Sequence, residues 1–109
     1  MKETLLVKHA VGGRTFIDTG KQPLDYEVIP EGEGWRFVIR TPWNDKVEEI
    51  VKWRNELNVF LFEEYSDRPT VKNWYYIKDG PVEYDQENER LTIHAQSRIG
   101  YVPDEFTVL

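Results

Sequence analysis

Turn-forming residues recur at short intervals along this sequence, and this spacing limits the fold more than any other feature. Gly12-Gly13, the cluster 30–34, Asp79-Gly80 and the polar run 86–89 each separate two segments rich in β-branched and aromatic residues. Such segments suit the pleated, half-buried surface of a sheet, and turns this short favour antiparallel β-hairpins. The strands expected from these boundaries span residues 4–10, 14–18, 24–29, 35–40, 59–62, 71–78, 82–85 and 90–96.

Several of these segments alternate between apolar and polar residues with the period of a strand. Trp35 and Phe37 share one face, Arg36 lies on the other, and the segment 90–96 alternates in the same way. This pattern is typical of a sheet with one buried face and one wet face. The run 59–62 is instead apolar at every position, so we expect a central strand that is covered on both faces, with a helix over one of them.

One stretch, residues 44–57, contains neither Gly nor Pro and repeats apolar residues at helical spacing. Asn44 is a suitable N-cap, and Lys52 and Arg54 come late, where the helix dipole favours positive charge. The apolar stripe consists of Trp43, Val47, Ile50, Val51 and Leu57. The sequence therefore predicts an α+β fold in which antiparallel β-hairpins, or a meander sheet, pack against a single central α-helix over about residues 44–57. We expect residues 1–109 to form one globular domain.

Composition narrows the classes of function. The 109 residues carry a formal net charge of -6, which disfavours the basic surface that nucleic-acid phosphates require. The chain has no Cys, which excludes thiolate chemistry and Cys-ligated metal sites. No stretch approaches the roughly 20 apolar residues of a membrane span, and the first residues lack a signal-peptide core. We therefore expect a cytoplasmic protein with no membrane partner.

The sharpest catalytic candidate is Phe16-Ile17-Asp18-Thr19-Gly20. Two apolar residues followed by Asp-Thr-Gly resemble the active-site loop of the retroviral-type aspartic proteases, which work as homodimers because two facing carboxylates share one proton. The resemblance implies that Asp18 would be the catalytic carboxylate of a dimeric hydrolase. The chain departs from that family at Lys21, where the family has Ala or Ser. The simpler interpretation is a strand that ends in a Thr-Gly turn with a solvated Asp18, and we assign no catalytic residue.

The ionisable residues form no recognised metal or cofactor motif. His9 and His94 belong to no H-x-x-x-H pair, and each is expected on a strand beside polar neighbours. The carboxylate pairs lack EF-hand spacing, and Gly32-Glu33-Gly34 lacks the Lys-Ser/Thr of a phosphate-binding loop. We predict neither a metal site nor a cofactor. A hydrolase that uses His94 with a nearby carboxylate stays open as an alternative.

The segment 72–78 combines aromatic and cationic residues on one face of a strand. Alternation places Lys72, Trp74, Tyr76 and Lys78 together. Exposed Trp and Tyr commonly anchor protein interfaces, and aromatics beside Lys also suit the stacking of single-stranded bases. In the simplest interpretation, the two aromatics are core residues and the lysines snorkel to solvent.

Arg54 is the second unusual feature. On the predicted helix it projects between Ile50-Val51 and Leu57, near the middle of the apolar stripe. A guanidinium group there must reach solvent, pair with a carboxylate, bond to backbone carbonyls, or bind an anion or partner at the seam between helix and sheet.

These observations predict a small, acidic, non-enzymatic protein-binding module. Inhibitors, immunity-type proteins, and accessory or virion components of phages and mobile elements belong to this class, and acidic inhibitors often mimic the charge of a nucleic acid. The expected partner is another protein, with a second copy of the chain as one candidate. The alternatives are the dimeric aspartyl-protease-like hydrolase and a single-strand nucleic-acid binder that uses the segment 72–78. The predicted partner-binding residues are Lys72, Trp74, Tyr76, Lys78 and Arg54.

Overall fold

The structure, a computed structural model, describes residues 1–77 and 82–102. Its elements in chain order are β1 (Lys2–His9), β2 (Thr15–Asp18), β3 (Tyr26–Glu31), β4 (Gly34–Arg40), α1 (Asp45–Lys52), β5 (Leu57–Glu64), β6 (Val71–Tyr76), β7 (Val82–Asp85), β8 (Arg90–Ala95) and β9 (Ser97–Tyr101). They form a first sheet in the order β2-β1-β5-β6-β9 and a second sheet in the order β3-β4-β8-β7. Every neighbouring pair is antiparallel, so the predicted α+β fold of antiparallel hairpins is confirmed.

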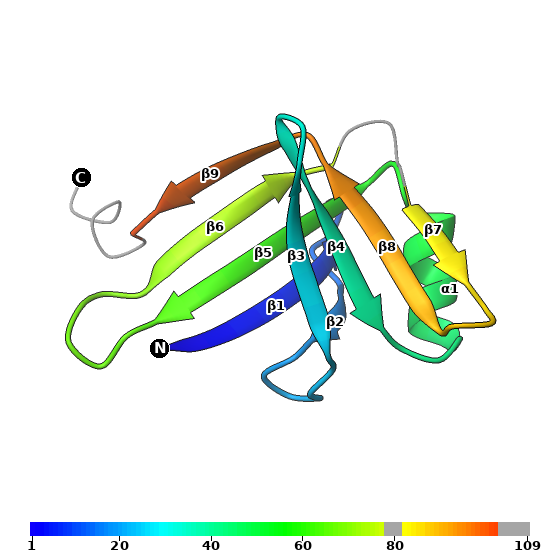
Figure 1. Cartoon of the computed structure of the whole chain (residues 1–109), viewed down its shortest axis with the longest axis horizontal. Helices are drawn as coiled ribbons and strands as arrows, with labels where there is room; N and C mark the ends of the chain where they lie inside the picture. The colour runs from blue at the N-terminus through cyan, green and yellow to red at the C-terminus, as the bar shows by residue number, and fades with distance from the viewer. Residues whose placement is uncertain (78–81, 103–109) are drawn as a thin grey trace.

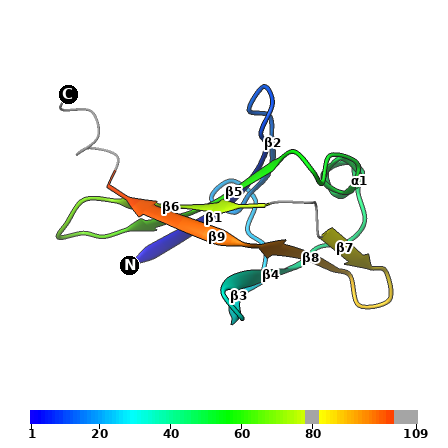
Figure 2. The ribbon, with the colours of Figure 1, turned by 90° about the horizontal axis from the view of Figure 1, so that it is seen from above.

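The two sheets pack face to face, and their strands run in clearly different directions (Figure 1). The second sheet covers only part of the first, and the β5–β6 hairpin extends beyond it (Figure 1). The helix α1 lies at one end of the molecule beside β2 and β7, away from the free end of that hairpin (Figures 1 and 2). The helix therefore closes one end of the sandwich and does not sit centrally between hairpins.

The core lies between the inner faces of the two sheets. Alternate residues of β4 and β8 are buried there, as the period-2 pattern predicted for the segments around Phe37 and Ile93. Tyr75 of β6 is 2% exposed, and its ring meets Phe37 edge-on at 4.7 Å between centroids and Trp35 at 5.5 Å. The other large side chains that are fully buried among the described residues are Leu5, Val7, Phe37, Ile39, Val47, Ile50, Val59, Leu91 and Ile93.

The helix is shorter than the sequence predicted. Asn44 is the N-cap as expected, because its Oδ1 accepts a hydrogen bond from the Val47 amide at 3.0 Å. The helix ends at Lys52, however, and Trp53 is the C-cap. Residues 53–56 turn the chain into β5, which begins at Leu57. Leu57 therefore joins the core from a strand, and Arg54 lies exposed in the turn instead of on the apolar stripe of the helix.

Two further expectations need correction. β5 is the central strand of the first sheet, but it is covered on one face only: Val59 and Leu61 are buried, whereas Phe60 and Phe62 are half-buried on the opposite face. The strand β9 was not predicted. It follows β8 after a single residue, Gln96, so the chain crosses from the second sheet to the first at this bend. From the sequence, residues 106–109 could form a short edge strand or a docking segment, and they lie outside the described residues.

Candidate partner-binding face

The outer face of the first sheet carries a continuous group of aromatic and aliphatic side chains. We call it the aromatic face and define it as Leu6, Phe60, Phe62, Lys72, Trp74, Tyr76, Ile99 and Tyr101. Strand pairing aligns Leu6 with Phe60, Phe60 with Trp74, and Trp74 with Ile99, so one apolar row crosses four strands. The second sheet lies on the other side of these strands (Figure 2). Trp74 is half-buried, and Tyr76 and Ile99 are 51% and 57% exposed.

The rings on this face pack against one another instead of under a covering layer. Phe60 stacks on Phe62 with centroids 6.4 Å apart and on Trp74 with centroids 6.3 Å apart. The Trp74 indole Nε1 donates a hydrogen bond of 3.1 Å to the side-chain oxygen of Asn58 on the neighbouring strand. These contacts hold the rings of neighbouring strands against one another.

Lys72 lies in the middle of the aromatic face. Its Nζ is 4.5 Å from the ring centroid of Phe60, 5.4 Å from that of Phe62 and 5.8 Å from that of Tyr101. An ammonium group over aromatic rings is attracted by their quadrupoles. Within the described residues, Lys72 forms no ion pair with a carboxylate.

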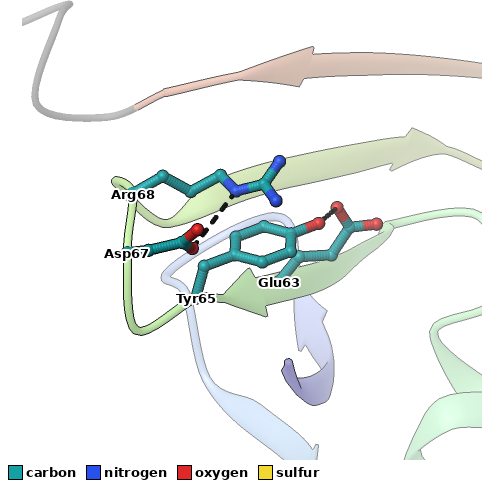
Figure 3. A network of polar contacts seen from close by, with 4 residues as sticks. All are labelled: Glu63, Tyr65, Asp67 and Arg68. Atoms are coloured by element: carbon teal, nitrogen blue, oxygen red, sulfur yellow. Dashed lines mark hydrogen bonds and ion pairs between the residues drawn. The ribbon is translucent and has the colours of Figure 1, made fainter.

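A second cationic group lies at the free end of the β5–β6 hairpin. Arg68 extends over the ring of Tyr65, with its Cζ 4.4 Å from the ring centroid (Figure 3). The Arg68 Nε is 3.5 Å from the carboxylate of Asp67, and the Tyr65 hydroxyl donates to Glu63 at 2.9 Å. That hydrogen bond to a carboxylate raises the pKa of Tyr65 above its ordinary value. The hairpin end is therefore a local polar network in which the charge of Arg68 is already compensated.

The structure brings together three of the five predicted partner-binding residues. Lys72, Trp74 and Tyr76 share the aromatic face, and the interpretation that Tyr76 is a core residue is wrong. Arg54 belongs to the turn after α1, on a different part of the molecule (its role as a partner contact stays a prediction), and Lys78 lies outside the described residues. The other members of the aromatic face were not predicted as site residues: Leu6, Phe60, Phe62, Ile99 and Tyr101. The uninterrupted apolar run 59–62 was the sequence signal for Phe60 and Phe62. Because strand side chains alternate, such a run places apolar side chains on both faces of the sheet, the outer face included.

Asp18, the candidate from the protease-like motif, ends the edge strand β2. Its Oδ1 accepts a hydrogen bond from the Gly20 amide at 2.9 Å, and the Thr19 hydroxyl accepts one from the Leu5 amide at 2.8 Å. The motif thus forms a closed turn that ties β2 to β1. Its polar side chains hold the local backbone.

The two histidines lie on different sheets, each beside one glutamate. The His9 Nε2 is 3.7 Å from Glu56, and the His94 Nδ1 is 3.3 Å from Glu31. Within residues 1–77 and 82–102, no three His, Asp or Glu side chains gather closely enough to hold a metal ion. No helix in that part of the chain is long and apolar enough to cross a membrane.

The outer face of the second sheet is charged and hollowed. A depression of about 450 Å³ lies over it. Cross-strand neighbours there are Arg36 beside His94, and Arg40 beside Arg90. Acidic side chains border the same depression, so the two signs of charge are interspersed as on an ordinary wet sheet. The acidic residues are Glu27, Glu83 and Asp85.

No protein family model, curated protein or solved structure matches this chain.

Proposed function

We propose that this chain is a small, non-enzymatic protein-binding module that engages another protein through the aromatic face. The observation that carries the proposal is the apolar row from Leu6 to Ile99, which crosses four strands and ends in the exposed side chains of Ile99 and, one row away, Tyr76. Large contiguous apolar patches on protein surfaces commonly mark interaction sites. Trp and Tyr are among the residues most enriched at binding hot spots.

The charge of this face supports a protein partner with acidic groups. Its central cation, Lys72, is held over three rings, in a chain whose formal net charge is -6. A cation among aromatics, rimmed by polar residues such as Asn58, suits a partner that brings carboxylates to a largely apolar contact. An inhibitor, an immunity-type protein, or an accessory or virion component of a phage or mobile element would each use such a face.

The test compares partner capture by three forms of the full chain. Wild type, Trp74→Ala and Trp43→Ala are each immobilised on a resin and incubated with a native lysate of the source cells. The bound proteins are quantified by mass spectrometry. We expect a partner that wild type retains and that Trp74→Ala loses. The control is Trp43→Ala, because Trp43 is an indole that is 45% exposed and packs beside Tyr84, away from the aromatic face.

The control separates binding from folding. Both substitutions remove one indole, and chemical denaturation of each variant shows that it folds before the captured proteins are compared. Retention of every captured protein by Trp74→Ala, or equal losses from both variants, would contradict the proposal.

A further inference from the structure

The four edge strands of the described sheets differ in how well they are protected against added strands. β2 and β7 have only four residues each and lie against α1. β3 carries Pro30 and two glutamates. Short length, Pro and charge are the usual devices that block an edge. β9, from Ser97 to Tyr101, has five residues with neither Pro nor a carboxylate, and it forms the upper border of the first sheet (Figure 1).

The side chains of β9 divide between the two faces. Pairing with β6 places Ile99 beside Trp74 on the aromatic face, and Arg98 beside Tyr75 on the inner side. A strand laid along β9 would extend the apolar row on one face and would meet Arg98 on the other. A strand that pairs with β9 would therefore fit best with apolar side chains at alternate positions. The side chains between them would face Arg98 and need to complement it.

Arg98 indicates that chemistry. Its Cζ lies 4.9 Å from the ring centroid of Trp35 and 6.0 Å from that of Tyr75, and among the described residues it forms no ion pair with a carboxylate. Arg14, Arg36 and Arg68, by contrast, each lie within 4 Å of a carboxylate. β6 and β9 together carry Lys72 and Arg98 and no acidic residue. A carboxylate on the added strand, at the position beside Arg98, would form an ion pair with this guanidinium group.

We propose that β9 is a strand-accepting edge, and that the partner adds an extended segment with an apolar side chain beside Ile99 and a carboxylate beside Arg98. This inference rests on the proposed function, since it specifies how the partner of the aromatic face is held. Backbone hydrogen bonds along β9 supply the affinity, and the alternation of apolar and acidic side chains supplies the specificity.

The test uses two blocked seven-residue peptides, Thr-Val-Glu-Val-Glu-Val-Thr and the same sequence with Lys in place of Glu. Binding to the full chain is followed by titration with amide NMR signals. We expect the acidic peptide to shift the signals of β9 and β6 and to bind at least about tenfold more tightly than the basic one, because like charges placed together at an interface are costly. In Arg98→Gln the ratio should fall to near one.

A third peptide isolates strand pairing from side-chain contact. The acidic peptide methylated on alternate backbone nitrogens keeps its side chains but cannot donate the ladder hydrogen bonds, so it should not bind. Equal binding of the acidic and basic peptides, undiminished binding of the methylated one, no binding of any peptide, or signal changes confined to the second sheet would overturn the proposal. A dimer that already protects the β9 amides would also overturn it.

The outcome is separable from that of the proposed function. If the aromatic face binds a partner without strand addition, capture by the full chain is lost in Trp74→Ala and unaffected in Arg98→Gln. If the proposed function itself fails, Trp74→Ala captures the same proteins as wild type.

Discussion

Both sheets are built from antiparallel strands, but their outer faces carry very different side chains. On the second sheet, cross-strand neighbours are Glu27 beside Val38 and Thr92 beside Glu83, so charge and polarity reach every strand. On the first sheet, the corresponding row is apolar from Leu6 to Ile99. The second sheet shows that this chain can build an ordinary solvated face. The aromatic face is therefore a specific feature that the inner packing of the sandwich does not require.

The largest effect is expected where β6 faces inward. Tyr75→Ala removes a side chain that is 2% exposed and held edge-on against Phe37, so we expect a loss of about 3–5 kcal/mol in the free energy of unfolding. Its neighbour Trp74 points outward, and Trp74→Ala should cost only about 1–2 kcal/mol, since part of that side chain is already in water. Chemical denaturation measures both. Equal losses would mean that the two faces of β6 are equally structural.

Partner affinity should show the opposite order. With a captured partner in hand, Trp74→Ala should weaken binding by at least about 2 kcal/mol, roughly thirtyfold, as expected for an aromatic hot spot. Thr92→Ala, on the wet outer face of the second sheet, should leave the affinity unchanged. Isothermal titration calorimetry measures both variants. A larger loss from Thr92→Ala would assign the interface to the second sheet.

The charge at the centre of the aromatic face should affect association more than folding. Lys72→Gln removes the cation over Phe60 and should lower the free energy of unfolding by at most about 1 kcal/mol. It should also reduce the salt dependence of the association rate with an acidic partner, because steering by exposed charges is screened by salt. Stopped-flow association at several salt concentrations measures this. An unchanged salt dependence would show that Lys72 does not face acidic groups.

The smallest effect is expected from pH, through the contribution of Asp85 in β7 of the second sheet to the free energy of unfolding. The side chain of Asn88, together with the amides of Asn88 and Glu87, donates hydrogen bonds to Asp85 and holds the pKa of that carboxyl below its ordinary value. A lowered folded-state pKa stabilises the fold above the unfolded value, near 4, and this stabilisation is lost as the pH falls through the folded value.

Unfolding of wild type and Asp85→Asn between pH 6 and pH 2 checks this point. The difference in stability should be largest above about pH 4 and should vanish in acid. A difference that grows as the pH falls would contradict the assigned cause.

Local signals in the sequence predicted the hairpins, the alternation around Phe37 and Ile93, and the N-cap at Asn44, because each depends on a few neighbouring residues. The end of the helix was missed because the stripe continued through Leu57, whose burial comes from a strand instead. β9 was missed because Gly100 and Pro103 are residues that commonly interrupt a strand. In the structure Gly100 pairs with Asn73, and an added Cβ there would lie 3.0 Å from the Asn73 side-chain oxygen.

The candidate site was predictable only in part. Alternation correctly placed Lys72, Trp74 and Tyr76 on one face of a strand. Whether a second layer covers that face depends on how the sheets stack, which a single strand does not reveal. For the same reason, the apolar run 59–62 suggested a strand covered on both sides, when Phe60 and Phe62 lie instead on the open face.

In the proposed function, the aromatic face, and no other exposed aromatic surface, contacts the partner. Hydroxyl-radical footprinting of the free and partner-bound chain tests it with a matched pair of residues, since Tyr76 and Trp43 are 51% and 45% exposed. We expect the bound partner to protect Tyr76 and Trp74 from oxidation and to leave Trp43 as reactive as in the free protein. Protection of Trp43 with no change at Tyr76 would contradict it.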